Sequence, residues 1–242
     1  MKVSVSALRS CTIQTAEGEI AKVDDLLFDD ATWVVRFLVV KTRPWLARRS
    51  VLLSPLSVED VDLRANALRV SLTREQVESS PDVSTREPVS RKEEKRLLDY
   101  YGYPPYWLGL EPAGLGLYPA AASPAASAAA IAGETLDPEM RAVQDTLPDT
   151  EQGDPHLRSA REVIGYTVTG PDGELGHVED ILLDPQSFAL DELIVDMRKW
   201  WPGKRVVVSA HEVRSIDFFQ HGIDVEIGRD ALESRPELEA GT

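Results

Sequence analysis

The chain consists mainly of two copies of one sequence. Residues 8–81 recur at 163–236 with a constant shift of 155 positions and no gap, and about 20 of the 74 aligned pairs are identical. A repeat of this length indicates that each copy is one small structural unit. The sequence therefore predicts two domains of similar size, at 1–84 and 156–238, with a connecting segment of different character at 85–155.

Each copy contains many short apolar runs separated by turn residues. In the first copy the runs lie at 20–28, 33–41, 51–53, 58–63 and 68–72, and the capping-box pattern that begins at Thr73 predicts a short helix before Pro81. Closely spaced strands of this kind favour a barrel, because closure removes the exposed strand edges. We expect a mainly β fold with two small six-stranded antiparallel barrels, each with a short terminal helix, joined by a helix plus a flexible linker.

The connecting segment has three parts. A capping box at Ser90–Glu93 predicts a charged helix over 90–101. Residues 100–107 form a cluster rich in tyrosine and proline, and the rest of the segment is first alanine-rich and then acidic. The composition of that last stretch predicts a flexible linker.

The two copies share the pattern G-E-[IL]-x-x-V-x-D-[LI]-[LF]-x-D at 18–29 and 173–184, followed by a β-rich run and a terminal helix. This pattern resembles the PRC-barrel family in both copies, and most strongly in the second. The resemblance implies a six-stranded β-barrel and a binding or assembly module without a shared catalytic set. The same barrel occurs in the cytoplasmic part of the photosynthetic reaction-centre H subunit and in a ribosome maturation factor.

Charge and cysteine content limit the kind of partner. The net charge is −15, divided as −1 over 1–85, −6 over 86–156 and −8 over 157–242, and such a field repels nucleic-acid phosphates. Cys11 is the single cysteine, so we expect a half-buried strand residue in a reducing compartment. No secretory segment is visible and the apolar run at 120–132 is too weak to span a bilayer. We expect a cytoplasmic protein that binds no nucleic acid and does not insert into a membrane.

Carboxylates and histidines are numerous, but their spacing does not indicate a metal site. Adjacent strand residues such as Asp24 and Asp25 point to opposite faces, so we interpret the acidic residues of both copies as strand-edge and turn carboxylates. Nucleophile motifs and phosphate-binding glycine loops are missing as well. We therefore predict no enzyme, no catalytic residues, no metal and no cofactor.

Aromatic residues beside cations are the candidates for protein contacts, since this composition is typical of interface hot spots. They are Trp45, Trp200 and Trp201, with Arg198, in the loops of the two copies, and Tyr103, Tyr106 and Trp107 in the connecting segment. Each tryptophan could instead close one end of its own barrel. The tyrosine cluster could pack on the first barrel, pack across a homodimer, or dock on another protein as an extended peptide.

The favoured hypothesis is a non-enzymatic protein-interaction or assembly module that binds a protein partner or a second copy of itself. The alternative is a peripheral component of a photosynthetic or electron-transfer membrane assembly, similar to the H-subunit barrel.

Overall fold

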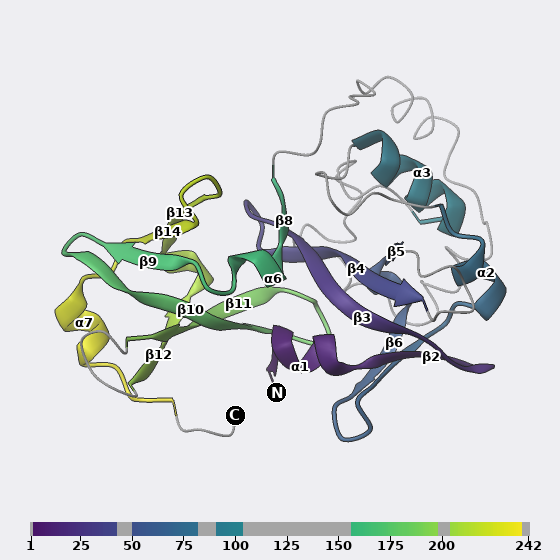
Figure 1. Ribbon diagram of the computed structural model, residues 1–242, viewed down its shortest axis with the longest axis horizontal. Coiled ribbons are helices and arrows are strands. Elements are labelled where there is room, and N and C mark those ends of the chain that lie inside the picture. The colour runs from purple at the N-terminus through teal and green to yellow at the C-terminus, as the bar shows by residue number, and fades with distance from the viewer. Residues whose placement is uncertain (1, 43–49, 82–90, 104–155, 198–203, 239–242) are drawn as a thin grey trace.

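The computed structural model describes residues 2–42, 50–81, 91–103, 156–197 and 204–238, and the chain is mainly β over these ranges. Two sheets lie side by side, one from each copy of the repeat (Figure 1). The sequence-based expectation of a mainly β protein with two small barrel-like units is confirmed.

The two copies have the same order of elements, and the bounds agree with the shift of 155 to within a few residues. The first copy contains β1 Val3–Ser4, α1 Val5–Ser10, β2 Thr12–Thr15, β3 Gly18–Asp29, β4 Val34–Thr42, β5 Ser50–Leu53, the 3-10 turn η2 Pro55–Ser57, β6 Val58–Asp62, β7 Ala67–Val70 and α2 Arg74–Glu78. The second contains β8 Leu157–Ser159, α6 Ala160–Val163, β9 Thr167–Gly170, β10 Gly173–Leu183, β11 Leu190–Asp196, β12 Arg205–Ser209, η4 Ala210–Glu212, β13 Val213–Asp217, β14 Gly222–Val225 and α7 Arg229–Glu233.

The sheet of each copy is curved but not closed. Its strand order is β5-β4-β3-β2-β7-β6 in the first copy and β12-β11-β10-β9-β14-β13 in the second. Each copy supplies six strands to its own sheet, as expected. The pairs β2–β7 and β9–β14 are parallel, so the sheets are mixed and the expectation of purely antiparallel pairing is corrected. The parallel pair arises because the chain returns to β2 through a crossover, which a meander of hairpins would not require.

A seventh strand in each sheet comes from the other copy. Strand β1 of the first copy pairs with β10 through Val3 and Leu183, and β8 of the second copy pairs with β3 through Arg158 and Phe28. These two pairings are related by the same shift of 155 positions. The copies therefore exchange their first strands reciprocally, a connection that the division into two domains does not include.

The turns that precede β4 and β11 meet between the copies. Val34 and Ala189 form an antiparallel bridge. The Val35 N–H donates to the Phe188 carbonyl at 3.0 Å, and the Leu190 N–H donates to the Trp33 carbonyl at 2.7 Å. Since positions 34 and 189 are themselves equivalent, an approximate twofold axis passes between them.

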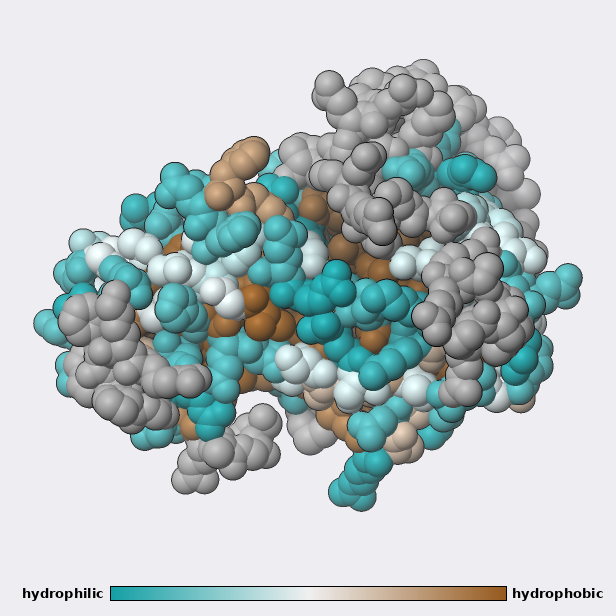
Figure 2. Space-filling view, viewed as in Figure 1, coloured by the Kyte–Doolittle hydropathy of each residue, from teal (hydrophilic) through white to brown (hydrophobic). Residues whose placement is uncertain are grey.

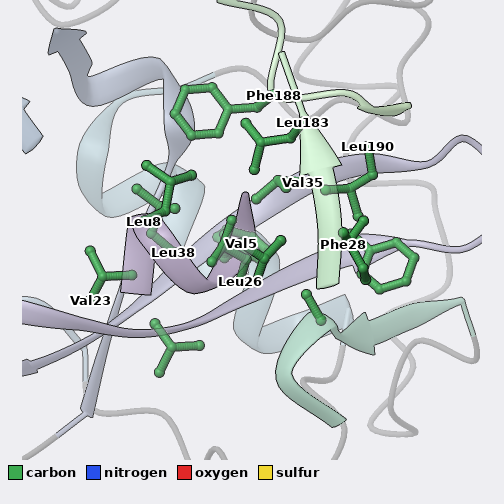
Figure 3. Close-up of a cluster of buried hydrophobic side chains, with 14 of the residues drawn as sticks. Val5, Leu8, Val23, Leu26, Phe28, Val35, Leu38, Leu183, Phe188 and Leu190 are labelled. Carbon is green, nitrogen blue, oxygen red and sulfur yellow. The ribbon is translucent and has the colours of Figure 1, made fainter. Parts of the chain in front are cut away.

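One hydrophobic core runs through both copies. Figure 3 shows Leu183, Phe188 and Leu190 of the second copy among side chains of the first, including Phe28 and Val35. All five are at most 2 % exposed. Burial of this apolar surface, worth about 25 cal/mol per Å², binds the two copies into one body.

The predicted helix of the connecting segment is present as α3, Arg91–Tyr101. Its apolar residues Leu97, Leu98 and Tyr101, together with Tyr103 just beyond it, belong to the common core. The Tyr100 hydroxyl donates to the Gln76 carbonyl of α2 at 2.9 Å. This helix therefore packs on the first copy of its own chain, near α2 (Figure 1).

Candidate functional site: an aromatic hairpin beside the junction of the two copies

The carboxylates of the shared sequence pattern hold the junction between the copies. Asp25 is 4 % exposed. Its Oδ2 accepts a hydrogen bond from Ser159 Oγ at 2.5 Å, and its Oδ1 accepts one from the Arg161 N–H at 3.0 Å. The equivalent Asp180 accepts from the Ser6 N–H at 3.2 Å. Each aspartate thus binds the first turn of the short helix, α1 or α6, that belongs to the other copy.

A β-bulge explains how neighbouring aspartates serve one junction. The β3–β4 register shifts between Val23 and Asp25, so Asp24 is the extra residue and strict alternation fails there. Asp24 forms ion pairs with Lys41 at 2.7 Å and with Arg161 at 2.9 Å. The interpretation of this acidic pair as strand-edge carboxylates is corrected, because both side chains bind residues of the other copy. Asp29 is a turn carboxylate, since its Oδ1 accepts from the Ala31 and Thr32 N–H groups at 3.0 Å.

The β13–β14 hairpin presents the most exposed large apolar side chain among the described residues. Phe219 at its tip is 100 % exposed. The turn is ordered by Asp217 Oδ1, which accepts from the N–H groups of Phe219 at 2.9 Å and Gln220 at 3.0 Å. Figure 2 shows a hydrophobic projection above the second copy, where this hairpin ends in Figure 1.

The base of the hairpin is packed against aromatic and cationic groups. The Arg158 guanidinium lies 4.1 Å from the centroid of the Phe218 ring, and Tyr166 meets that ring edge to face at 5.9 Å. His221 stacks on Tyr166 at 5.1 Å between ring centroids. Such contacts fix the orientation of the rings, and we call these five residues, Arg158, Tyr166, Phe218, Phe219 and His221, the aromatic hairpin site.

The site is also connected to the first copy. Arg158 belongs to the exchanged strand β8 and forms an ion pair with Asp30 of the first copy at 2.6 Å. His156 Nδ1 lies 2.8 Å from the other oxygen of the same carboxylate. The position of the hairpin therefore depends on the junction between the copies as well as on its own turn.

The Tyr166 hydroxyl is kept neutral, which favours a packing role for this residue over a role in proton transfer. Burial, assisted by the negative charge of nearby Glu162, raises the pKa of the Tyr166 hydroxyl to about 12. The phenol is therefore neutral near pH 7 and can donate a hydrogen bond to Glu162, which lies 3.3 Å away. Among the described residues, no group of three or more His, Cys, Asp or Glu side chains could hold a metal ion.

The first copy has no counterpart of this aromatic site. The shift of 155 places Leu63, Arg64, Asn66 and Cys11 where the second copy has Phe218, Phe219, His221 and Tyr166. The backbone is the same in both, since Asn66 and His221 each adopt a left-handed conformation, with φ of 49° and 51°. A difference in side chains on an equivalent backbone is typical of a function added to a scaffold.

The residues predicted from the sequence as protein contacts fall mostly outside the described part of the chain. This applies to Trp45, Trp200, Trp201, Arg198, Tyr106 and Trp107, which stay predictions. Tyr103 is described and is 2 % exposed, and burial raises the pKa of its hydroxyl to about 12. Cys11, expected to be half-buried, is fully buried at the end of α1, and burial raises its thiol pKa.

The aromatic hairpin site was not predicted from the sequence, because its residues lie outside the pattern that the two copies share. The signal that could have revealed the site is a difference in sequence between the two copies. Phe218-Phe219 replaces Leu63-Arg64 in a hairpin that both copies close with an aspartate at the same position, Asp62 or Asp217. An apolar pair at the tip of a solvated turn is unusual enough to mark a contact surface.

A comparison with protein families gives a match for the second copy. Residues 155–232 match the model of the PRC-barrel domain, which covers the second copy from just before β8 into α7. This domain suggests a non-catalytic module. No curated protein matches the chain. Within the described ranges, no helix is long and apolar enough to cross a membrane.

Proposed function

We propose that the chain is a non-enzymatic protein-interaction module made of two PRC-barrel copies, and that the aromatic hairpin site is where its partner docks. The observation that carries the proposal is the complete exposure of Phe219 on a hairpin whose base is fixed by packing. When a partner covers a large apolar side chain that was exposed to water, the free energy of the system falls.

The assignment of both copies to one domain type is supported by the equivalence of their elements. Only the second copy matches the family model, but the first has the same strand order and the same parallel pair. It also has the corresponding reciprocal strand. We infer that the first copy is a PRC-barrel whose sequence has diverged further.

The site has the composition and rigidity of a docking anchor. Aromatic and arginine side chains supply most of the binding free energy in protein interfaces, and Phe218, Tyr166 and Arg158 already hold one another in place. The hairpin backbone that carries Phe219 is thereby fixed, so little backbone entropy is lost when its ring enters a pocket. The −8 charge over 157–242 favours a partner with an apolar pocket in a neutral or basic surface.

Site-specific photo-crosslinking tests this function. A benzophenone amino acid is placed at Phe219 in one variant and at the equivalent Arg64 in a matched control. We expect one cellular protein to be captured from position 219 and not from position 64, and Phe219→Ser to abolish co-purification of that protein. Capture of the same proteins from both positions, or co-purification unchanged by Phe219→Ser, would exclude the hairpin as the docking site.

A further inference from the structure

The backbone pairings and one aspartate–helix hydrogen bond between the two copies recur in both directions. The strand pairing of Val3 with Leu183 is repeated by that of Arg158 with Phe28. In the same way, the hydrogen bond from the Ser6 N–H to Asp180 is repeated by the one from the Arg161 N–H to Asp25. The bridge between Val34 and Ala189 lies at the centre. The junction is therefore a nearly self-complementary interface of the kind that forms closed twofold dimers.

The covalent connection does not by itself decide which molecules contribute the two halves of this interface. Between Tyr103 and His156 lie the 52 residues 104–155, which could reach roughly 170 Å if fully extended. A second copy of the repeat can therefore lie against the first copy of its own chain or against that of another chain. The backbone and side-chain contacts at the junction are identical in the two cases.

We propose that two molecules of this protein exchange copies, so that the first copy of each chain pairs with the second copy of the other. The partner that fits the junction is thus a second molecule of this chain. Since no contact at the junction is gained or lost, only effective concentration separates the two forms. The monomer dominates at low protein concentration, and the exchanged dimer becomes comparable near the effective concentration set by the connecting segment, on the order of 1 mM.

The bridge at the centre of the junction provides a specific reporter. The hydrogen bonds flank Val34 and Ala189, which makes them a non-hydrogen-bonded antiparallel pair. In such a pair the Cα atoms are about 4.5 Å apart, within the range that a disulfide spans. In a Cys11→Ala background, the variants Val34→Cys and Ala189→Cys are purified separately as full-length chains, mixed, unfolded in urea and refolded at about 1 mM before oxidation.

A covalent dimer that joins the two variants is the expected result, because neither chain alone contains a cysteine pair. Well below about 1 mM, where monomer dominates, its ratio to monomer should rise about tenfold when the protein concentration is raised tenfold, by mass action. As the geometric control, the double variant Val34→Cys/Ala189→Cys at low concentration should form an internal disulfide.

Three results would overturn the proposal. The first is absence of the mixed covalent dimer while the double variant closes internally. The second is failure of the double variant to close, which would contradict the junction itself. The third is an equal yield of covalent dimer from either single-cysteine variant refolded alone. None of these outcomes depends on the docking role of Phe219, so the proposed function is tested separately.

Discussion

Asp25 and Asp180 occupy equivalent positions in the two copies, but they differ in burial and in the number of hydrogen bonds that they accept. Asp25 is buried and accepts from Ser159 Oγ, from the Arg161 N–H and from its neighbour Leu26 at 2.8 Å. Asp180 is more exposed and accepts from the N–H groups of Ser6 and Ile181. Buried acceptors with several donors are the costlier ones to remove, because each donor is left unsatisfied.

Asp25→Ala should therefore lower the free energy of unfolding by about 2 kcal/mol, and Asp180→Ala by about 1 kcal/mol. Urea titration of both variants under identical conditions measures the difference. Equal losses, or a larger loss for Asp180→Ala, would mean that the hydrogen bonds of Asp25 across the junction contribute little.

In the second copy, an ion pair between Glu212 and Arg235 links the 3-10 turn η4 to the segment that follows α7. Their carboxylate and guanidinium form two hydrogen bonds, at 2.5 and 3.0 Å. The Arg235 hydrogen bonds lower the pKa of Glu212 below its ordinary value of 4.5, against the opposing effect of partial burial. The equivalent residues of the first copy, Ser57 and Ser80, cannot form an ion pair.

Glu212→Gln should lower the free energy of unfolding by about 1 kcal/mol at neutral pH. Because the folded-state pKa is lowered, the contribution of the pair is complete above pH 4.5 and is lost as the pH falls through that lower pKa. The difference between wild type and variant should thus vanish in acid. Glu226→Gln, which weakens the mostly exposed pair with Arg214, is the control and should have little effect at any pH. If the difference in unfolding free energy between wild type and Glu212→Gln persists in acid, the stabilisation does not come from the Glu212–Arg235 ion pair.

At the scale of the element, the β13–β14 hairpin carries two adjacent phenylalanines, of which Phe218 is packed and Phe219 is exposed. Phe218→Ser should lower the free energy of unfolding by about 2 kcal/mol, since it removes packing against Arg158 and Tyr166. Phe219→Ser should change it by less than about 0.5 kcal/mol, because the ring is wholly exposed. Thermal unfolding of both variants is the measurement. A substantial loss for Phe219→Ser would show that its ring has a structural role and would weaken its assignment as a docking anchor.

Individual elements were predictable where the signal was local. The runs at 20–28 and 33–41 correspond to β3 and β4, and the capping box at Thr73 begins α2 with both of its hydrogen bonds. The exchanged strands β1 and β8 were not predictable, because strands of two or three residues have no periodicity and their pairing partners lie in the other copy. The aromatic hairpin site required a comparison of the differences between the copies.

At the scale of the whole molecule, the reciprocal strands and the common core make the two copies one body. The exchanged strands, the aspartate–helix contacts and the central bridge all cross from one copy to the other. The side chains of Figure 3 come from both copies. Unfolding one copy would expose this surface and leave the edges of β3 and β10 unpaired. We therefore expect the two copies to unfold together.

Hydrogen exchange in two matched variants tests this claim most directly. Val51→Ala in the first copy and Val206→Ala in the second remove equivalent, fully buried side chains, at a cost of about 2 kcal/mol each. If the copies unfold as one unit, either variant should accelerate the slowest amides of both β3 and β10 by about 30-fold. Acceleration confined to the copy that carries the substitution would contradict the account.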